Sequence, residues 1–270
     1  MKMPARLVRN LAAPVVILGI WQLLSYLGLF KPVILPSPVA VIERFWLYLV
    51  PAETLSNSVG IYDWVWSSEL LGDLVASSRR IVLGFVVGAG LALPLGLLMG
   101  TDRRIEGFLN PVIQFLRPIP PIAYIPLAIL WFGLGDPPAV FLIALGAFFP
   151  VLINTIAGVR NVDSIYIRAA TNLGADRLTM FRRVILPAAT PYILTGMRIG
   201  IGTAFIVVIV AEMIAVNSGL GYRILEAREY MWSDKVIAGM IAIGLLGLAI
   251  DIGVNRLNDY LLRWHRGIES

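Results

Sequence analysis

The sequence has no cysteine and a single histidine. Without cysteine, the chain can form no disulfide, thiolate metal site or cysteine nucleophile. The histidine, His265, follows Trp264 in a basic tail, where an interfacial or solvated role explains it better than catalysis. A membrane enzyme would need a nucleophile with a base, or a metal cluster. The sequence presents neither, so we do not expect an enzyme.

Charge is also scarce. Charged residues make up 14% of the chain, whereas an average soluble domain has roughly a quarter. Hydrophobic residues make up 58% of the 270 residues, and the mean hydropathy is +0.82, which predicts an all-α integral membrane protein. The net charge of +5 would favour nucleic acid in a soluble chain. Here the arginines flank apolar segments, as cytoplasmic membrane loops do, and we expect no nucleic-acid partner.

Apolar segments of bilayer length predict six transmembrane helices in one domain, residues 1–270, because a span needs about 20 apolar residues. The predicted spans are residues 11–29, 74–99, 108–132, 139–159, 192–216 and 236–254. The first span follows a basic start but precedes no A-x-A cleavage site, so we interpret it as an uncleaved span.

Prolines interrupt residues 31–73, which therefore do not form a span. Within them, Ser37 as N-cap and Pro38 at the first helical position predict a helix over residues 38–50. Its apolar residues fall on one face, which is typical of a helix at the outer membrane surface. Trp64 and Trp66 are candidate interfacial anchors.

Arginine and lysine are more frequent in the segments that the six spans place on one side, including both ends of the chain. The positive-inside bias therefore predicts that both termini are cytoplasmic. Arg79 and Arg80 are counted with the outer segments, whereas Arg117 and Arg198 remain within spans.

Glycines recur along two of the spans. In the second span they are spaced for close helix packing, which we favour over a role in a pathway. They are Gly84, Gly88, Gly96 and Gly100, and a further series in the fifth span is Gly196, Gly200 and Gly202.

The third span is interrupted by Arg117-Pro118-Ile119-Pro120-Pro121. Prolines so close together cannot continue one helix, and such a break is tolerated at membrane depth only inside protein or beside a watery cavity. Arg117 is therefore a functional candidate. The alternative is an arginine that reaches the inner interface or pairs with a carboxylate.

Two further spans carry polar residues. Pro150 and Asn154 place a kink and an amide in the fourth span. Arg198 and Glu212 lie in the fifth span, about 21 Å apart along a helix, so they cannot pair with each other within it. Each needs another partner or a wet cavity.

The stretch from Ile165 to Pro191 is rich in arginine and small residues and lies between two apolar segments. Its order predicts a helix with a small face at Ala169 and Ala170, a stop at Gly174, and a second amphipathic helix that runs up to a proline. We interpret residues 163–187 as cytoplasmic docking helices. The alternative is an ordinary amphipathic loop.

This stretch, RAATNLGA followed by VILP, resembles the coupling loop of ATP-binding-cassette importer permeases of the type I (MetI-like) fold. That pattern is E-A-A, three residues, G, nine residues, then I-x-L-P. The spacing matches at Ala169, Ala170, Gly174, Val184, Leu186 and Pro187. Arg168 stands where the pattern has glutamate, so a salt link made by that acid is not carried over.

Other blocks are similar to permeases of the nitrate, sulfonate and taurine uptake family, and most resemble the taurine and alkanesulfonate branch. They are LRPIPPIAYIPLAILWFGLGD at 116–136, TGMRIGIGTAF at 195–205, AEMIAVNSGLGY at 211–222, and the closing LLRWHRG.

The resemblance implies a multi-pass permease of the bacterial inner membrane that works as a pair of copies. Its partners would be two cytoplasmic ATPase subunits and an external substrate-binding protein. The chain has no G-x-x-x-x-G-K-[ST] phosphate loop, so the ATPase would bind ATP and magnesium, and no cofactor is expected here. The implied ATPase-coupling residues are Arg168, Ala169, Ala170, Gly174, Ala175, Asp176 and Arg177.

The resemblance also implies import of a small anion by alternating access. We expect taurine or an alkanesulfonate; nitrate or bicarbonate is the alternative within the same fold. Arg117 is the favoured anion donor, with Asn154 and Thr203 as neutral helpers. Arg198 could serve instead, or bind structurally to a carboxylate such as Glu212 of a second copy, or to loop carbonyls. The candidate pathway residues are Arg117, Asn154, Arg198, Thr203 and Glu212.

An ion-coupled secondary transporter is the more remote alternative. It would also have broken helical spans, but it should carry several intramembrane carboxylates and an internal repeat. Glu212 and Asp251 are the carboxylates that qualify, and we find no convincing repeat.

Overall fold

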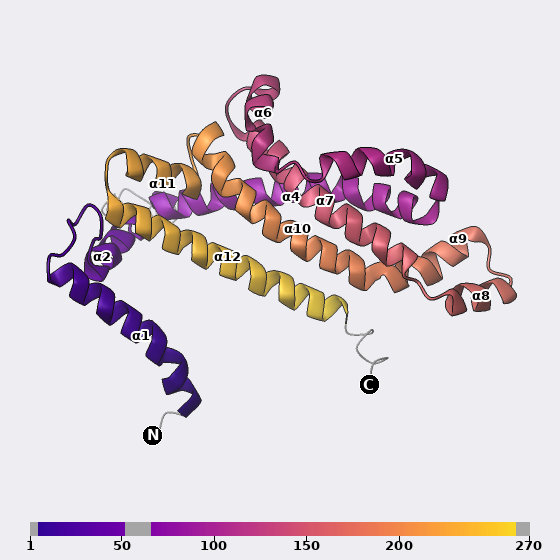
Figure 1. Ribbon diagram of the computed structural model, residues 1–270, viewed down its shortest axis with the longest axis horizontal. Helices are drawn as coiled ribbons and strands as arrows, with labels where there is room; N and C mark the ends of the chain where they lie inside the picture. The colour runs from indigo at the N-terminus through magenta and orange to yellow at the C-terminus, as the bar shows by residue number, and fades with distance from the viewer. Residues whose placement is uncertain (1–4, 52–65, 263–270) are drawn as a thin grey trace, which may run out of the picture. The chain divides into compact units, whose positions relative to one another are not determined.

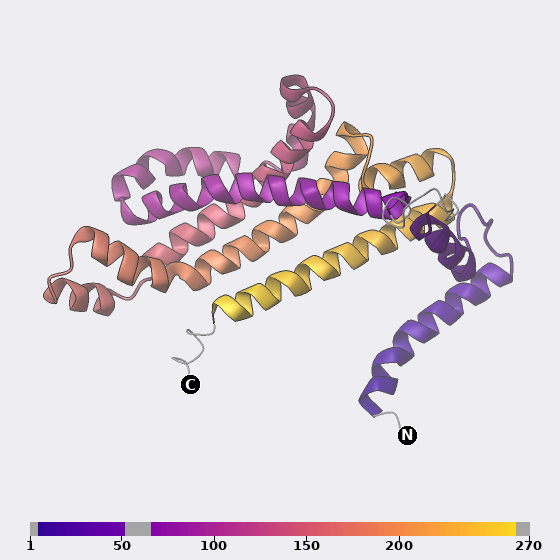
Figure 2. The ribbon, with the colours of Figure 1, turned by 180° about the vertical axis from the view of Figure 1, so that it is seen from behind.

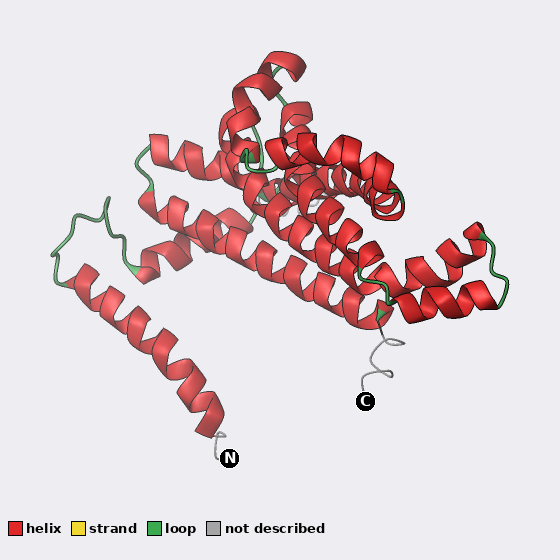
Figure 3. Ribbon diagram, turned by 45° about the vertical axis from the view of Figure 1, so that its right-hand side comes forward, coloured by secondary structure: helices red, strands yellow, loops and turns green. Residues whose placement is uncertain are grey.

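The computed structural model describes residues 5–51 and 66–262, and the side chains from residue 12 onward. Within these ranges every regular element is helical, as the all-α prediction expects (Figure 3). Figure 1 labels the α-helices. They are α1 Ala5–Tyr26, α2 Pro38–Leu49, α4 Glu69–Thr101, α5 Arg103–Leu116, α6 Ile125–Phe132, α7 Asp136–Arg160, α8 Ser164–Asn172, α9 Arg177–Met180, α10 Leu186–Ala215, α11 Leu220–Glu229 and α12 Ser233–Leu261.

Four helical stretches in the described part of the chain are long and apolar enough to cross a membrane: α4, α7, the run Arg177–Ala215, and α12. The pair α5 and α6 adds a fifth if it forms one broken span, with a bend of 84°. The apolar part of α1, Ala12–Tyr26, is shorter than the roughly 20 residues a straight span needs. The arrangement is consistent with six spans, and the count of six stays a prediction.

Several helices extend beyond the predicted spans. For example, α4 covers residues 69–101 rather than 74–99, and α12 covers 233–261 rather than 236–254. Hydropathy marks only the part of a helix that can lie in hydrocarbon. The backbone hydrogen bonds continue beyond it into polar residues.

The chain divides into two compact units. The first contains residues 1–75 and 218–246, and the second contains residues 76–217 and 247–270. The predicted outer helix belongs to the first unit: Ser37 caps α2 by accepting a hydrogen bond from the Ala40 amide at 3.1 Å. Part of its apolar face is exposed, at Ile42 and Trp46, whereas Phe45 and Leu49 pack against the core of this unit. The position at the outer membrane surface stays a prediction. Trp66 is exposed as well, whereas Trp64 and the tail with His265 lie outside the described residues.

In the first unit, one buried carboxylate connects several helices through hydrogen bonds. Asp73 accepts hydrogen bonds from the Tyr48 hydroxyl at 2.7 Å, the Gly219 amide at 2.8 Å and Arg223 Nε at 2.9 Å. Burial and the neighbouring Asp73 carboxylate raise the pKa of Tyr48. These bonds join α2 and the start of α4 to α11.

Helix α7 is the core of the second unit, and α4 and α10 both pack against it. The glycines of α4 face α7: a Cβ added at Gly84 would lie 2.5 Å from Ile143 Cγ2, and one at Gly96 would lie 2.7 Å from Thr155 Cβ. On α10, Gly196 approaches the Asn154 Cβ in the same way. Figure 2 shows α4 running along this part of the unit. The packing role predicted for the glycines of the second span is confirmed.

The glycine contacts predict a sharp difference between two neighbouring positions. A Cβ at Gly88 would overlap the Ala144 carbonyl oxygen, whereas a Cβ at Gly90 meets nothing within 4 Å. Gly88→Ala should lower stability by about 1–3 kcal/mol because backbone cannot yield to the methyl group. Gly90→Ala should be neutral or stabilising, by up to about 1 kcal/mol, because alanine favours helix. Thermal unfolding in detergent measures both, and equal melting temperatures would contradict this packing.

Candidate functional site

The proline-rich segment breaks the third apolar stretch as predicted. Helix α5 ends at Leu116, and the Arg117 amide still donates to the Ile113 carbonyl at 2.9 Å. Pro120 is extended, a short 3-10 turn covers Pro121–Tyr124, and α6 then departs at 84°. The prolines cause the turn because they remove backbone donors and clash with a continuing helix.

A cavity of about 460 Å³ lies beside this break, between it and the middle of α7 and α10. Among the described residues that line it, Arg117, Asn154 and Thr203 carry the polar side chains. The rest of the lining is apolar, proline or glycine. Three of the five predicted pathway residues thus come together at one site, although they lie far apart in the sequence.

Asn154 and Thr203 are partly engaged with backbone. Asn154 Nδ2 donates to the Pro150 carbonyl at 2.8 Å. The Thr203 hydroxyl lies 2.9 Å from the Gly146 carbonyl of α7 and 2.9 Å from the Gly200 carbonyl, and its one proton can serve one of them at a time. Arg117 is exposed and makes no side-chain hydrogen bond or ion pair within the described part of the chain. It is therefore the charged donor available at this cavity.

Glu212 and Arg198 do not line this cavity, so the structure does not bring these two pathway candidates together with Arg117. Glu212 is fully buried and accepts hydrogen bonds from Arg80 at 2.7 Å and Ser77 at 2.9 Å. Arg198 forms an ion pair with Asp251 at 3.3 Å beside a separate cavity of about 80 Å³. Each of these two charges is paired with a residue of another helix, because an unpaired charge in an apolar surrounding costs free energy.

The partner of Glu212 was not predicted from the sequence. Arg79 and Arg80 were expected in the outer segments, but both lie within α4, and the Arg80 side chain is 4% exposed. Arg80 also bonds Asp136 at the start of α7, at 2.7 Å. A signal was present: Ser77, Arg80, Gly84 and Gly88 recur at helical spacing, so Ser77 and Arg80 share the face that packs on α7.

Adjacent arginines allow a matched test of this ion-pair network. Arg80→Met should lower stability by about 3–5 kcal/mol, because it leaves the Glu212 carboxylate buried without its charged partner. Arg79→Met should cost at most about 1 kcal/mol, since the Arg79 side chain is 63% exposed. Melting temperatures in detergent compare the two. A similar small shift for both variants would show that the buried pair contributes little.

The predicted docking segment forms a helix, a glycine stop and a second helix, at one end of the second unit (Figure 1). Asp163 caps α8 by accepting from the Ile165 amide at 2.9 Å. Gly174 has φ +78°, which confirms the left-handed stop after α8, and Asp176 caps α9 by accepting from the Thr179 amide at 3.0 Å. Hydrogen bonds from Thr179 lower the pKa of Asp176.

The docking segment is left uncovered by the rest of this unit. Arg168, Ala169, Asp176 and Arg177 are exposed, and Ala170 and Ala175 are half-buried. Leu173 is 87% exposed. Arg168 donates to the Ser164 hydroxyl at 3.2 Å, one turn earlier in α8. An apolar side chain presented this way, flanked by arginines, is typical of a protein contact surface.

The second docking helix does not end at Pro187, contrary to the prediction. After α9 the chain makes a π-helical turn over Phe181–Ile185 and passes directly into α10. The Leu186 amide donates to the Phe181 carbonyl, five residues earlier. This wider turn accommodates a proline that would clash in a regular helix. The docking segment is thus continuous with the helix that carries Thr203.

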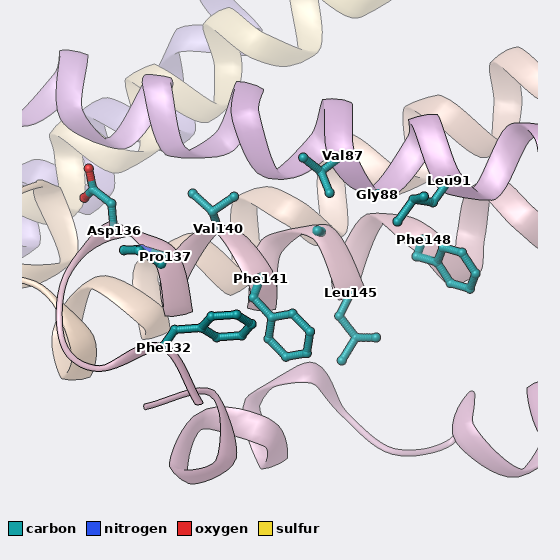
Figure 4. Close-up of a pocket in the computed structure, with 11 residues that line it drawn as sticks. Val87, Gly88, Leu91, Phe132, Asp136, Pro137, Val140, Phe141, Leu145 and Phe148 are labelled. Carbon is teal, nitrogen blue, oxygen red and sulfur yellow. The ribbon is translucent and has the colours of Figure 1, made fainter. Parts of the chain in front are cut away.

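A second large cavity in the same unit, of about 480 Å³, has a different chemistry. Figure 4 shows apolar side chains of α4, α6 and α7 around it, with the Asp136 carboxylate at one end. That carboxylate is bound by Arg79 and Arg80. The lining offers an anion no free donor, so the cavity beside Arg117 is the candidate solute site.

The candidate site therefore combines a cationic donor, neutral polar groups and apolar walls inside a helical membrane unit, and an uncovered docking segment is continuous with one of its helices. Such an arrangement can bind a solute and pass it on, which is the chemistry of a transport permease.

Comparison with known proteins supports a transport permease. Residues 92–267 match the family model described as "Binding-protein-dependent transport system inner membrane component". The chain is 39% identical to an aliphatic sulfonates transport permease protein of Bacillus subtilis, over 97% of this chain and 89% of the relative. It is 36% identical to the taurine transport system permease protein of Escherichia coli, over 94% of this chain and 88% of the relative.

The fold resembles that of a chain from the MetNI methionine ABC transporter in an inward-facing conformation. The TM-score is 0.63 at 17% sequence identity, with 71% of this chain and 95% of that chain covered. This likeness supports the type I importer fold. The chain belongs to the family of binding-protein-dependent inner membrane transport components, and it is an ATP-binding-cassette importer permease. In this family a separate subunit hydrolyses ATP, so the ion-coupled transporter considered above is excluded.

Proposed function

We propose that this permease imports a small organic sulfonate, either taurine or an alkanesulfonate, across the bacterial inner membrane. The observation that carries the proposal is Arg117, an arginine beside a cavity in the spanning unit that has no counter-ion among the described residues. A cation without a counter-ion attracts an anion, and apolar walls beside it strengthen the attraction because they lower the local dielectric constant. The names of the two sulfonate and taurine relatives support sulfonate over nitrate or bicarbonate.

The family implies an ATPase partner and a substrate-binding protein. In our proposal, two copies of the permease form the pathway, two ATPase subunits bind ATP and magnesium, and both termini lie in the cytoplasm with the docking segment. The exposed arginines and Leu173 of that segment support a contact with the ATPase. Movement of α8 and α9 would pass through the continuous helix to Thr203 at the cavity, and alternate its opening.

The docking role can be tested at Gly174. Gly174→Val should impair ATPase binding and transport, because a side chain costs about 1–2 kcal/mol in the left-handed conformation and a β-branched one fits it worst. Gly174→Asn should retain most activity, since asparagine tolerates that conformation. ATPase copurification and solute-stimulated ATP hydrolysis measure both variants. Normal activity of Gly174→Val would remove the argument for a shaped stop at this position.

The donor role can be tested at Arg117. Arg117→Ala should reduce sulfonate uptake at least about tenfold, whereas Arg117→Lys should retain part of it, because charge-assisted hydrogen bonds to an anion are each worth about 1.5–3 kcal/mol. The permease should still assemble with its ATPase. The assay is ATP-dependent uptake of labelled taurine and ethanesulfonate into vesicles that contain the complete importer, with nitrate as competitor. Uptake unchanged in Arg117→Ala would make this arginine structural.

A further inference from the structure

We infer that the cavity beside Arg117 selects sulfonates with an uncharged tail, and that it disfavours both the zwitterion taurine and small inorganic anions. This inference rests on the proposed sulfonate import and specifies its substrate class. Taurine carries an ammonium group in addition to its sulfonate, whereas an alkanesulfonate carries the sulfonate alone. An alkanesulfonate therefore needs only a positive charge in the lining, whereas taurine also needs a negative charge for its ammonium group.

The described lining offers a positive charge and no negative one. Arg117 can bind the sulfonate, but none of the described residues around the cavity is a carboxylate. The oxygens of Asn154 and Thr203 can accept a hydrogen bond from an ammonium, but as neutral groups they do not compensate its lost hydration. An ammonium against this lining would find neutral hydrogen-bond acceptors but no counter-charge among the described residues.

Four carboxylates elsewhere in the helices of this unit are already paired with arginines. Glu212 bonds Arg80, Asp136 bonds both Arg79 and Arg80, and Asp251 bonds Arg198. Near the cytoplasmic end, Glu106 pairs with Arg160. To serve taurine, one of these acids would have to leave its arginine, which is itself costly in an apolar surrounding. Arg117 is the charged residue of the described lining, and no carboxylate of the described residues pairs with it, so it is available to the solute.

The remaining walls suit a hydrocarbon tail. Ile119, Ile122 and Phe149 are among the apolar side chains that line the cavity, and its volume of about 460 Å³ exceeds what a two-carbon sulfonate fills. Each buried methylene should raise affinity about fourfold. Nitrate and bicarbonate have no tail to place against these walls, and they give up hydration without that compensation.

Three sulfonates test the charge argument cleanly. Ethanesulfonate, 2-hydroxyethanesulfonate and taurine share a two-carbon sulfonate and differ in the terminal group: methyl, hydroxyl or ammonium. Binding of each to the purified permease–ATPase complex, without the binding protein, is measured by calorimetry. We expect ethanesulfonate to bind at least about tenfold more tightly than taurine, with 2-hydroxyethanesulfonate closer to ethanesulfonate and pentanesulfonate tighter than all three.

A carboxylate placed in the lining should reverse this order. Ile206 lines the cavity and is 62% exposed, so Ile206→Asp should bind taurine more tightly relative to ethanesulfonate, by at least about tenfold. Ile214→Asp is the matched control, because Ile214 is on the same helix, is 50% exposed and does not line the cavity. Asn154→Asp, which changes charge with little change in shape, serves as the second variant.

The outcomes separate the inference from the proposed function. Equal binding of taurine and ethanesulfonate, no binding of any sulfonate, or a ratio that Ile206→Asp and Asn154→Asp leave unchanged would overturn the inference. Sulfonate uptake by the complete importer would still support the proposed function in those cases. Uptake of nitrate or bicarbonate with no sulfonate uptake would overturn both.

Discussion

The second unit depends on how closely α4 and α10 approach α7. Glycines on both helices meet side chains or backbone of α7 at distances that leave no room for a Cβ. Only this close approach lets Arg80 of α4 reach Asp136 of α7 and Glu212 of α10 with the same guanidinium group. It also brings the Thr203 hydroxyl of α10 to the Gly146 carbonyl of α7, at the wall of the candidate cavity. In a membrane, where water drives helices together little, packing of this kind is the main source of helix association.

The same packing explains which charges are structural and which is available. A charge in a spanning helix is costly unless it is paired or faces water. Glu212 and Arg198 satisfy that condition with partners from other helices. Arg117 lies where prolines end α5 and turn the chain, so no neighbouring helix of this unit brings it a carboxylate. The break that would weaken an ordinary span thus leaves Arg117 without a carboxylate partner among the described residues of this unit.

The docking segment and the cavity share one helix. The π-helical turn at Phe181–Ile185 is wide enough to accommodate the ring of Pro187, so the helix continues past this proline. A regular proline break at this point would have created a hinge between the segment and α10. Continuity favours a rigid transmission of movement from the docking segment to Thr203, as alternating access by rigid elements requires.

The sequence by itself determined the class of the protein, because hydropathy, the glycine spacing and the proline break act through the chain's local chemistry. The helix stop at Gly174 and the cap at Ser37 were predictable for the same reason: each depends on residues within one turn. Arg117, Asn154 and Thr203 were candidates for the pathway before the fold was known, but only the fold shows that they line one cavity.

What only the tertiary structure decided was how the charges pair. Arg80 and Glu212 are separated by more than a hundred residues, and nothing in their local sequence states that their helices meet on α7. Arg80 lies near one end of an apolar stretch, where hydropathy alone cannot tell a buried arginine from one in an outer loop. The continuity of α9 with α10 could not be predicted from the sequence either, because a proline ends a helix unless the preceding turn widens. Pairing and backbone relaxation depend on neighbours in space, which sequence order does not record.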